Sequence, residues 1–321
     1  MNARVATVLL AVALVAAGCA SSAAPAPVTV TPVEVLPSGT QPVITAPDAA
    51  NTDCNPEASL RPGPLPSPGA MPPGSTMATI AERGLLVVGV DQNTYFFGSR
   101  NPATGQLEGF DIDIAREIAR SIFGDPNHIQ LRVVDASQRE SKLENGLVDL
   151  VVRTYTITCD RKQKVDFSTV YYTAHQRILA ARGSGIDSPA ALSGKRVCAV
   201  EGTTSLSRLY ALKPRPNLVG VSAWTDCLVL LQQGQVDAIS TDDVVLKGLE
   251  KQDPNNVEVV GPDMSDEPYG VGVNMKNSDL VRFVNGVLDR MRQDGTWQRL
   301  YDAHLRSLGP SPGPPPAKYQ D

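Results

Sequence analysis

The sequence repeats one local plan twice in the same order, and this repeat restricts the folds open to the chain. The segment Gly84-Leu-Leu-Val87-Val-Gly-Val90-Asp91-Gln-Asn-Thr94 resembles Gly194-Lys-Arg-Val197-Cys-Ala-Val200-Glu201-Gly-Thr-Thr204. Further on, Leu143-Glu-Asn-Gly146-Leu-Val148-Asp149-Leu150 resembles Leu231-Gln-Gln-Gly234-Gln-Val236-Asp237-Ala238. The first pair predicts buried strands that open into loops, and the second predicts helix ends stopped by glycine and followed by strands. The repeat therefore favours two similar α/β lobes.

The chain must cross between two such lobes and return. We expect the first crossing near Ile178–Arg182 and a return strand within Tyr269–Met275. An amphipathic helix should follow, with its apolar stripe running from Leu280 to Met291, and Gly295 should separate it from a second helix that contains Trp297. Two crossings create a hinge and a cleft, where small ligands usually bind.

Proline placement separates the folded region from its flanks. Thirteen of the 26 prolines lie between Pro25 and Pro73, and five lie between Pro310 and Pro316. Segments of this composition bury too little apolar surface to offset the entropy of ordering them. We therefore predict these parts in chain order: signal peptide 1–18, lipid-anchored Pro/Ala-rich tether 19–77, lobe 1 from 78–178 plus 273–308, lobe 2 from 179–272, and a disordered tail 309–321.

The N-terminus has the pattern of an export signal. Arg4 provides a positive start, and the apolar run Val5–Ala17 is too short to span a bilayer comfortably. Small residues lead directly into Cys19, which resembles a lipobox in which this cysteine is lipidated. We expect an exported protein held by lipid at the outer face of the membrane, and plain secretion is the alternative.

Export makes the remaining cysteines interpretable. Four are left after Cys19, an even number for an oxidising compartment, and they allow three pairings. We favour Cys198–Cys227 because both residues fall in one lobe, which leaves Cys54–Cys159; free buried thiols are the alternative. No C-x-x-C pair or Cys/His cluster indicates a metal site, and we expect no cofactor.

Several motifs carry a resemblance to a known family. Gly109-Phe-Asp-Ile-Asp-Ile-Ala-Arg-Glu-Ile-Ala-Arg-Ser-Ile122, Thr156-Ile-Thr-Cys-Asp-Arg161, Gly202-Thr-Thr-Ser205 and Thr241-Asp-Asp243 occur in this order. Together they resemble the family 3 extracellular solute-binding proteins, the amino-acid receptors of ABC importers. Cys159 beside Arg161, together with the long tether, is most similar to lipid-anchored glutamine- and glutamate-binding members from actinobacteria.

The resemblance implies a fold and a mode of binding. The fold is α/β, a two-lobed periplasmic-binding-protein-like fold of type II, in which each lobe is a mixed sheet flanked by helices. Arg161 from one lobe would hold the ligand carboxylate, since a guanidinium forms two parallel hydrogen bonds. Asp242 from the other lobe would take the ammonium group, so binding favours closure. The full candidate set is Arg161, Thr156, Thr154, Thr203, Thr204, Asp242, Asp91, Arg153, Gly202 and Tyr95.

The preferred amino acid is less well defined by the sequence. Arg153 stands where many relatives have a small residue, and Arg100 and Arg139 are further basic candidates in the first lobe. A cationic side pocket favours glutamate or aspartate over arginine or lysine, while glutamine and asparagine are similar in shape. Tyr95 would pack on the aliphatic part of the ligand or in the core, and Asp91 would line the cleft or end its strand.

Other functions are weighed against this one. A net charge of −5 and 5% aromatic residues argue against nucleic-acid binding. An exported dehydratase of the same fold is disfavoured because Asp242 keeps the ammonium-binding role and no nucleophile or P-loop motif is present. We therefore expect a monomeric receptor, not an enzyme, which delivers a free amino acid to a membrane permease. A membrane sensor would contact the same closed surface and is the alternative partner.

Overall fold

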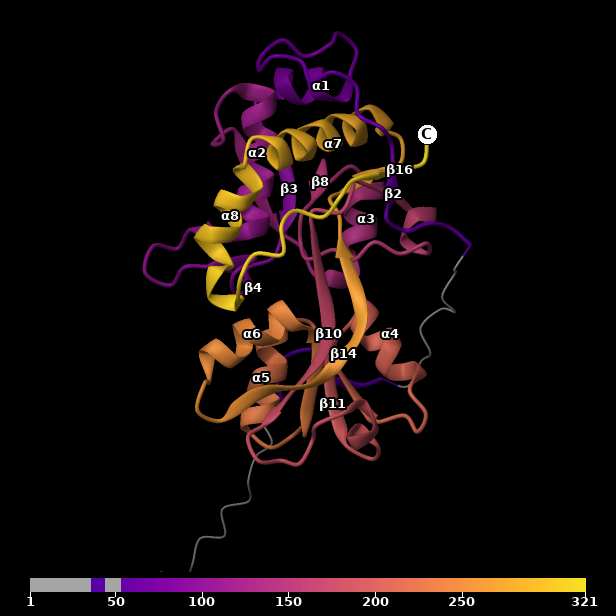
Figure 1. Ribbon diagram of the computed structural model, residues 1–321, viewed down its shortest axis with the longest axis vertical. Helices are drawn as coiled ribbons and strands as arrows, with labels where there is room; N and C mark the ends of the chain where they lie inside the picture. Colours follow the sequence, from indigo (N-terminus) through magenta and orange to yellow (C-terminus); the bar gives the residue numbers. More distant parts are fainter. Residues whose placement is uncertain (1–35, 44–52) are drawn as a thin grey trace, which may run out of the picture. The chain divides into compact units, whose positions relative to one another are not determined.

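The structure is a computed structural model that describes residues 36–43 and 53–321. The predicted signal peptide and Cys19 lie outside the described residues. Within these ranges, no helix has the length and apolar character needed to cross a membrane. Residues Leu36–Asp321 form one compact unit, which contains two larger sheets and the long strands β10 (Tyr172–Ala181) and β14 (Val257–Tyr269) between them (Figure 1).

Lobe 1 is built on a five-stranded mixed sheet, which confirms the first predicted α/β unit. Its strands, in order across the sheet, are β7 (Ile129–Val133), β3 (Leu86–Val90), β8 (Leu150–Val151), β15 (Gly272–Asn274) and β9 (Val165–Phe167). The first three strands are parallel and the last two pairings are antiparallel. Every residue of β3 is buried, as expected for a strand covered on both faces of a sheet.

Helices pack around this sheet and the aromatic core of lobe 1. They are α1 (Thr76–Arg83), α2 (Phe110–Phe123), α3 (Arg139–Glu144), α7 (Ser278–Gln293) and α8 (Thr296–His304), with short 3-10 turns η1 (Ala136–Gln138), η2 (Arg161–Gln163) and η4 (Arg306–Leu308). A small sheet of β4 (Asn93–Thr94), β5 (Gly98–Arg100) and β6 (Leu107–Glu108) lies in the same lobe. The predicted amphipathic helix is α7, with Leu280, Val284 and Met291 buried, and α8 follows it after Gly295.

Lobe 2 is a second α/β unit built on a mixed sheet, as the sequence repeat predicts. Its six strands, in spatial order, are β1 (Gln41–Pro42), β12 (Asn217–Val221), β11 (Arg196–Val200), β13 (Ala238–Asp242), β10 and β14. Its helices are α4 (Thr204–Ala211), α5 (Trp224–Gln232) and α6 (Asp243–Gln252), with one 3-10 turn, η3 (Pro189–Leu192). The repeated segments form β3 and β11 as first strands, and β8 and β13 after the helices α3 and α5.

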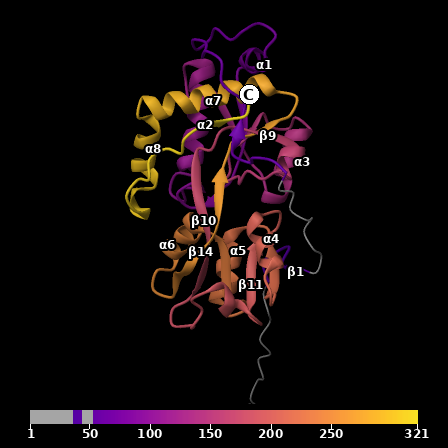
Figure 2. The same ribbon diagram turned by 45° about the vertical axis from the view of Figure 1, so that its right-hand side comes forward.

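The two long strands β10 and β14 form the connection between the lobes (Figure 2). They pair antiparallel from Tyr172 opposite Tyr269 to Ala181 opposite Val257. The first crossing strand therefore begins before the predicted position near Ile178. At its lobe 1 end, the rings of Tyr172 and Tyr269 pack edge-on against Phe97, at centroid distances of 5.2 and 5.8 Å. The connection is thereby anchored in the core of lobe 1.

Both favoured disulfides are present. Cys198–Cys227 joins β11 to α5 within lobe 2. Cys54–Cys159 attaches the segment predicted as a tether to the loop before Arg161. The second disulfide therefore lies next to a residue that the resemblance assigns to the ligand.

The prediction of a disordered C-terminal tail is wrong. β16 (Lys318–Tyr319) pairs in parallel with β2 (Ala58–Ser59), inside the segment predicted to be a loose tether. The Tyr319 hydroxyl donates to Asp289, and the Asp321 carboxylate forms an ion pair with Arg282, both on α7. Specific side-chain contacts at the very end of the chain thus order a segment whose proline content argued for disorder.

We expect removal of residues 310–321 to lower the free energy of unfolding. Net contributions of about 1 kcal/mol per hydrogen bond give a loss of roughly 2–3 kcal/mol for the pairing and side-chain contacts together. Urea denaturation of the full and shortened chains measures it. The matched control is Lys318→Gln, which removes only the exposed Lys318–Glu57 ion pair and should change stability by less than about 1 kcal/mol. Equal midpoints for the full and shortened chains would show that the tail contributes no stability.

Candidate ligand-binding site

A cavity lies where loops of the two lobes face each other. It encloses about 290 Å³ of space not filled by protein atoms, part of which is open to solvent. The residues lining it are Arg139, Arg153, Thr154, Thr156 and Arg161 from lobe 1, and Thr203, Thr204, Ser205, Trp224, Thr241, Asp242 and Val245 from lobe 2. The mixed polar and apolar lining is that of a site for a small polar molecule.

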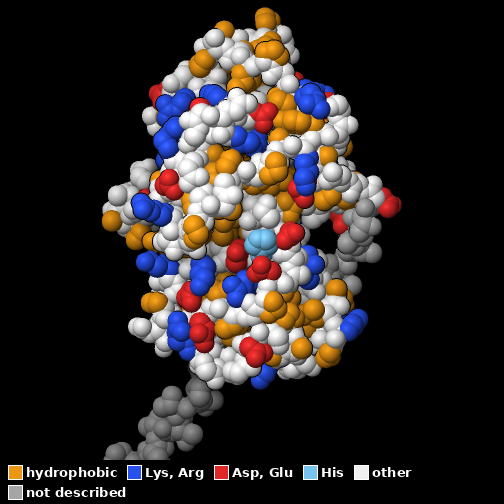
Figure 3. Space-filling view, viewed as in Figure 1, with side chains coloured by type: hydrophobic (Ala, Val, Ile, Leu, Met, Phe, Trp, Pro, Cys, Tyr) orange, Lys and Arg blue, Asp and Glu red, His pale blue; other side chains and the backbone are white. Residues whose placement is uncertain are grey.

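The charge of the lining differs from that of the surrounding surface. On the face shown in Figure 3, basic and acidic side chains are interspersed over both lobes. The cavity instead carries three arginines and a single carboxylate, that of Asp242. The three arginines come from lobe 1 and the carboxylate from lobe 2. A molecule with separated negative and positive groups fits this arrangement.

Two of the arginines form one cluster. Arg139 at the start of α3 and Arg161 at the start of η2 each donate to the carbonyl oxygen of Gly202 in lobe 2, at 3.0 Å. Both guanidinium groups lie over the ring of Tyr155, at 4.2 and 5.0 Å. Burial, followed by the charge of Arg161, lowers the pKa of Arg139 to about 9. This cluster links the two lobes directly.

Glu140 contacts both Tyr155 and Arg161 of this cluster. Its carboxylate accepts the Tyr155 hydroxyl at 2.6 Å and lies 3.4 Å from Arg161 Nε. Although burial opposes the shift, Arg139 and Arg161 lower the pKa of Glu140. Arg161 also donates to the Thr156 carbonyl at 2.6 Å. Since a guanidinium has five N–H donors, Arg161 retains donors beyond these contacts for a ligand carboxylate.

The N-terminus of α4 forms the opposite wall. Thr203 is the N-cap residue, and its hydroxyl oxygen accepts from Leu206 N at 3.2 Å. Thr204 and Ser205 are the first two helical residues, and both line the cavity. N–H groups at this position precede the first intrahelical hydrogen bonds and lie at the positive end of the helix dipole. They can therefore donate to an anionic group of a ligand.

Asp242 ends strand β13 and is 5% exposed. The Tyr269 hydroxyl donates to its Oδ2, while Oδ1 has no hydrogen-bond partner among the residues described. Burial, followed by the nearby charge of Glu267, raises the pKa of Asp242 to about 8. A buried carboxylate oxygen without a partner is costly, so this site favours a cationic or hydrogen-bond-donating group.

Arg153 forms another part of the lobe 1 wall and is buried. Its Nη2 lies 3.1 Å from Asp91 Oδ2, whereas its Nε has no hydrogen-bond partner in the described part of the chain. Next to it, Thr154 has a φ of +37°, in the left-handed region that is uncommon for threonine. Asp111 holds this conformation by accepting the Thr154 N–H at 2.7 Å. Burial raises the pKa of Asp111 to about 6, against the hydrogen bonds that lower it.

The structure brings together most of the predicted ligand residues. Those that line the cavity are Arg161, Thr156, Thr154, Thr203, Thr204, Asp242 and Arg153. The other three lie outside the lining. Asp91 is buried behind Arg153, Gly202 presents its carbonyl to the arginine cluster, and Tyr95 is 41% exposed against Gly248 of α6.

Sequence reasoning missed several residues of the site. Trp224 and Val245 supply its apolar part, and Tyr269 holds Asp242. Trp224 follows β12 just as Thr204 follows β11 and Asp243 follows β13, so strand ends offered a signal for it. Nothing in the local sequence marks Tyr269, because its partner is 27 residues away.

The comparisons with known proteins agree with this geometry. Residues 86–307 match the family of bacterial extracellular solute-binding proteins, family 3. The chain belongs to this family. The match covers both lobes and every residue of the cavity.

Characterised relatives of this solute-binding protein bind amino acids according to their names. The ABC transporter glutamine-binding protein GlnH of Bacillus subtilis is 38% identical over 72% of this chain and 85% of its own length. The glutamine-binding protein of Geobacillus stearothermophilus is 41% identical over 62% and 76%. The glutamate-binding protein GluB of Corynebacterium glutamicum is 31% identical over 72% and 82%. These relatives are receptors rather than enzymes.

Solved structures confirm the two-lobed type II fold. The L-cysteine solute receptor of Neisseria gonorrhoeae is 27% identical, with a TM-score of 0.70 over 73% of this chain and 95% of its own. An ancestral arginine-binding protein bound to glutamine is 33% identical, with a TM-score of 0.65 over 70% and 98%.

We expect Gly202→Ala to prevent the lobes from reaching this arrangement. Gly202 has a φ of +72°, and a Cβ there would lie 2.6 Å from Ser137 Cα in lobe 1. Backbone on both sides leaves little room to adjust, so ligand affinity should fall at least about tenfold, or 1.4 kcal/mol. Calorimetry measures the affinity, and small-angle scattering measures closure.

Gly146→Ala is the matched control for this variant. Gly146 has a similar φ of +64°, but no atom lies within 4 Å of the Cβ position. It therefore introduces the same backbone strain, about 1–2 kcal/mol, without the contact across the cleft. Equal ligand affinity in the two variants would refute the steric argument.

Proposed function

We propose that this protein captures an acidic amino acid by closing its lobes and delivers it to an ABC importer. The observation that carries the proposal is the carboxylate oxygen of Asp242 that has no partner among the residues the structure describes, and that lies in the same cavity as three arginines. An ammonium group can donate a hydrogen bond to the Asp242 oxygen, and carboxylates can accept hydrogen bonds from the arginines. A free amino acid carries both kinds of group one carbon apart.

In this proposal, the α-groups of the ligand are held by opposite lobes. Arg161 takes the α-carboxylate together with the N–H groups at the start of α4, and Asp242 takes the ammonium group. Thr154 and Thr156 complete the lobe 1 side. Only the closed arrangement brings all of these groups to one molecule, so the ligand stabilises closure.

The side chain of the ligand would face the remaining positive charge. Arg153 Nε is buried and has no hydrogen-bond partner in residues 36–43 and 53–321, and the lining has more arginines than one carboxylate group requires. An acidic amino acid has two carboxylates and one ammonium group, which complements three arginines and one aspartate. Relatives named for glutamine and for glutamate support a ligand of this shape. We therefore favour glutamate or aspartate, with glutamine and asparagine as weaker ligands.

The proposed setting is the outer face of the cell membrane. The N-terminal pattern supports export, and Cys19 supports attachment through lipid. The protein would act there as a monomer, and a membrane permease would receive the ligand. The name of the Bacillus subtilis relative supports an ABC importer as the partner.

A thermal-unfolding panel of the twenty amino acids tests the choice of ligand. A ligand at 100 times its Kd adds about 2.7 kcal/mol of stability, which raises Tm by roughly 4–5 °C for a chain of this size. We expect glutamate and aspartate to give the largest shifts. Stabilisation by arginine or lysine without stabilisation by glutamate would refute the acidic side pocket.

Replacing Asp242 tests the ammonium site. Asp242→Asn keeps the shape but removes the charge, so glutamate affinity should fall about 10- to 150-fold, the loss of one charge-assisted hydrogen bond of about 1.5–3 kcal/mol. Calorimetry measures it. Asp237→Asn is the matched control, because Asp237 pairs with Arg196 and does not line the cavity. Unchanged binding by Asp242→Asn would contradict the assignment.

A further inference from the structure

One buried carboxylate next to the cavity has no role in the function proposed above. Glu267 is fully buried on β14, two residues before Tyr269, and it does not line the cavity. A buried charge of this kind requires hydrogen bonds and a counter-charge. Its partners therefore indicate what it does.

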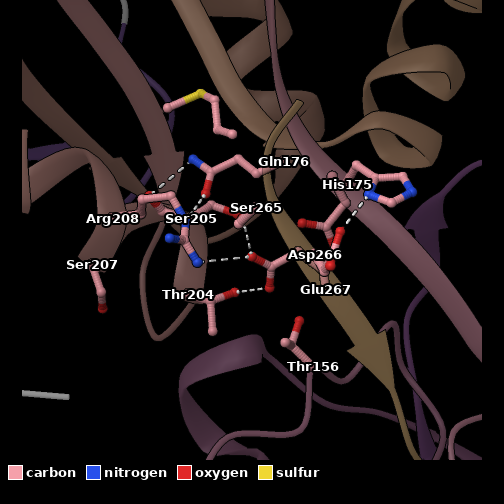
Figure 4. Close-up of polar contacts among 12 residues, drawn as sticks. Thr156, His175, Gln176, Thr204, Ser205, Ser207, Arg208, Ser265, Asp266 and Glu267 are labelled. Carbon is pink, nitrogen blue, oxygen red and sulfur yellow. Dashed lines mark hydrogen bonds and ion pairs between the residues drawn. The ribbon is translucent and has the colours of Figure 1, made fainter. Parts of the chain in front are cut away.

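The partners of Glu267 come from α4, whose N-terminus lines the cavity, and from the connecting strand β14. The Thr204 hydroxyl donates to Glu267 Oε2 at 2.7 Å, and the Ser265 hydroxyl donates to Oε1 at 2.7 Å. Arg208 of α4 lies 3.5 Å from Oε1 and also donates to Gln176 on β10, at 3.1 Å. Figure 4 shows these side chains directed toward one another, with Thr204 at the edge nearest Thr156.

We propose that Glu267 is a positioning residue for ligand binding, which acts on the cavity through Thr204 and Asp242. This inference rests on the proposed function, because Thr204 and Asp242 are the groups that would meet the ligand. Glu267 reaches them from β14, a strand that connects the lobes.

The action through Thr204 follows from hydrogen-bond geometry. A hydroxyl has one proton, and Thr204 gives it to Glu267. This bond fixes the Thr204 side chain at the first turn of α4 and leaves its oxygen as an acceptor. Thr204 therefore offers a ligand carboxylate its backbone N–H rather than its hydroxyl proton.

The action through Asp242 is electrostatic. The charged and titratable groups that face Asp242 are Tyr269 and Glu267 from β14, Asp243 from α6 and Arg139 from α3. Tyr269 and Arg139 favour the ionised form of Asp242, whereas Glu267 and Asp243 oppose it. After burial, Glu267 is the largest cause of the raised pKa. The neighbouring His175 bonds Asp266 at 3.0 Å, away from the cavity (Figure 4).

This arrangement makes binding depend on pH. The pKa of Asp242 is raised to about 8, so at lower pH its carboxyl group holds a proton that must leave before an ammonium group can bind. Glutamate affinity should therefore increase as pH rises toward 8 and then level off. Removing the charge of Glu267 lowers the pKa of Asp242, so the increase should end at a lower pH.

The test measures glutamate affinity by calorimetry between pH 5.5 and 9 in four proteins. Glu267→Gln keeps an acceptor for Thr204 but removes the charge, and its midpoint should move down by about one pH unit. Arg208→Met removes the counter-charge of Glu267 and should move the midpoint up. Arg215→Met is the matched control, because this exposed arginine stacks on Tyr210 and touches none of these groups. It should behave as the unaltered protein.

An affinity loss in Glu267→Gln that is equal at every pH would reduce Glu267 to a structural role and overturn the inference. A readout without ligand separates the two proposals. Carboxyl ¹³C NMR of the free protein follows the titration of Asp242 directly, and the same downward shift is expected in Glu267→Gln. If the unaltered protein binds no amino acid, the proposed function fails; if it binds glutamate and the Asp242 titration is unchanged in the variant, only the inference fails.

Discussion

The buried carboxylate of Asp242 imposes the strongest requirement on the structure around it. A charge removed from water must find a partner, and among the described residues the Tyr269 hydroxyl is the one hydrogen-bond donor to this carboxylate. Burial with so few partners disfavours the ionised carboxylate and thereby raises the pKa of Asp242. In the proposed function, a ligand ammonium group would supply the missing partner, and closure of lobe 1 over β13 would exclude water from the pair. The position of Asp242 therefore connects the hinge to the chemistry of recognition.

Closure also has contacts of its own, made by protein atoms alone. Arg139 and Arg161 both donate to the Gly202 carbonyl across the cleft. These bonds lower the free energy of the closed form before any ligand is considered, so less of the ligand's binding energy is spent on closing. The absence of a side chain at Gly202 allows this approach. The same residue thus determines both how closely the lobes meet and where the arginines lie.

The sequence predicted the two lobes from its repeats, and it favoured the two disulfides from lobe membership and elimination. It was insufficient where a contact joins distant segments. The spacing of Ser137 and Glu140 resembles a helix capping box, yet α3 begins at Arg139 and Glu140 bonds Tyr155 instead. The prediction of a disordered tail was wrong for a similar reason. Proline content describes a segment on average and does not reveal a single side-chain contact such as that of Tyr319 with Asp289.

Two of the three arginines of the cavity lie beside a carboxylate, and this limits how strongly they attract a ligand. Asp91 pairs with Arg153, and Glu140 lies beside Arg161. The carboxylates orient the guanidinium groups and offset part of their positive charge. A bound anion is therefore attracted less strongly than it would be by arginines without acidic neighbours. Three unpaired arginines would hold an acidic ligand tightly and release it slowly. In the proposed function, the receptor hands its ligand on and needs the weaker, oriented form, which the buried pairs would provide.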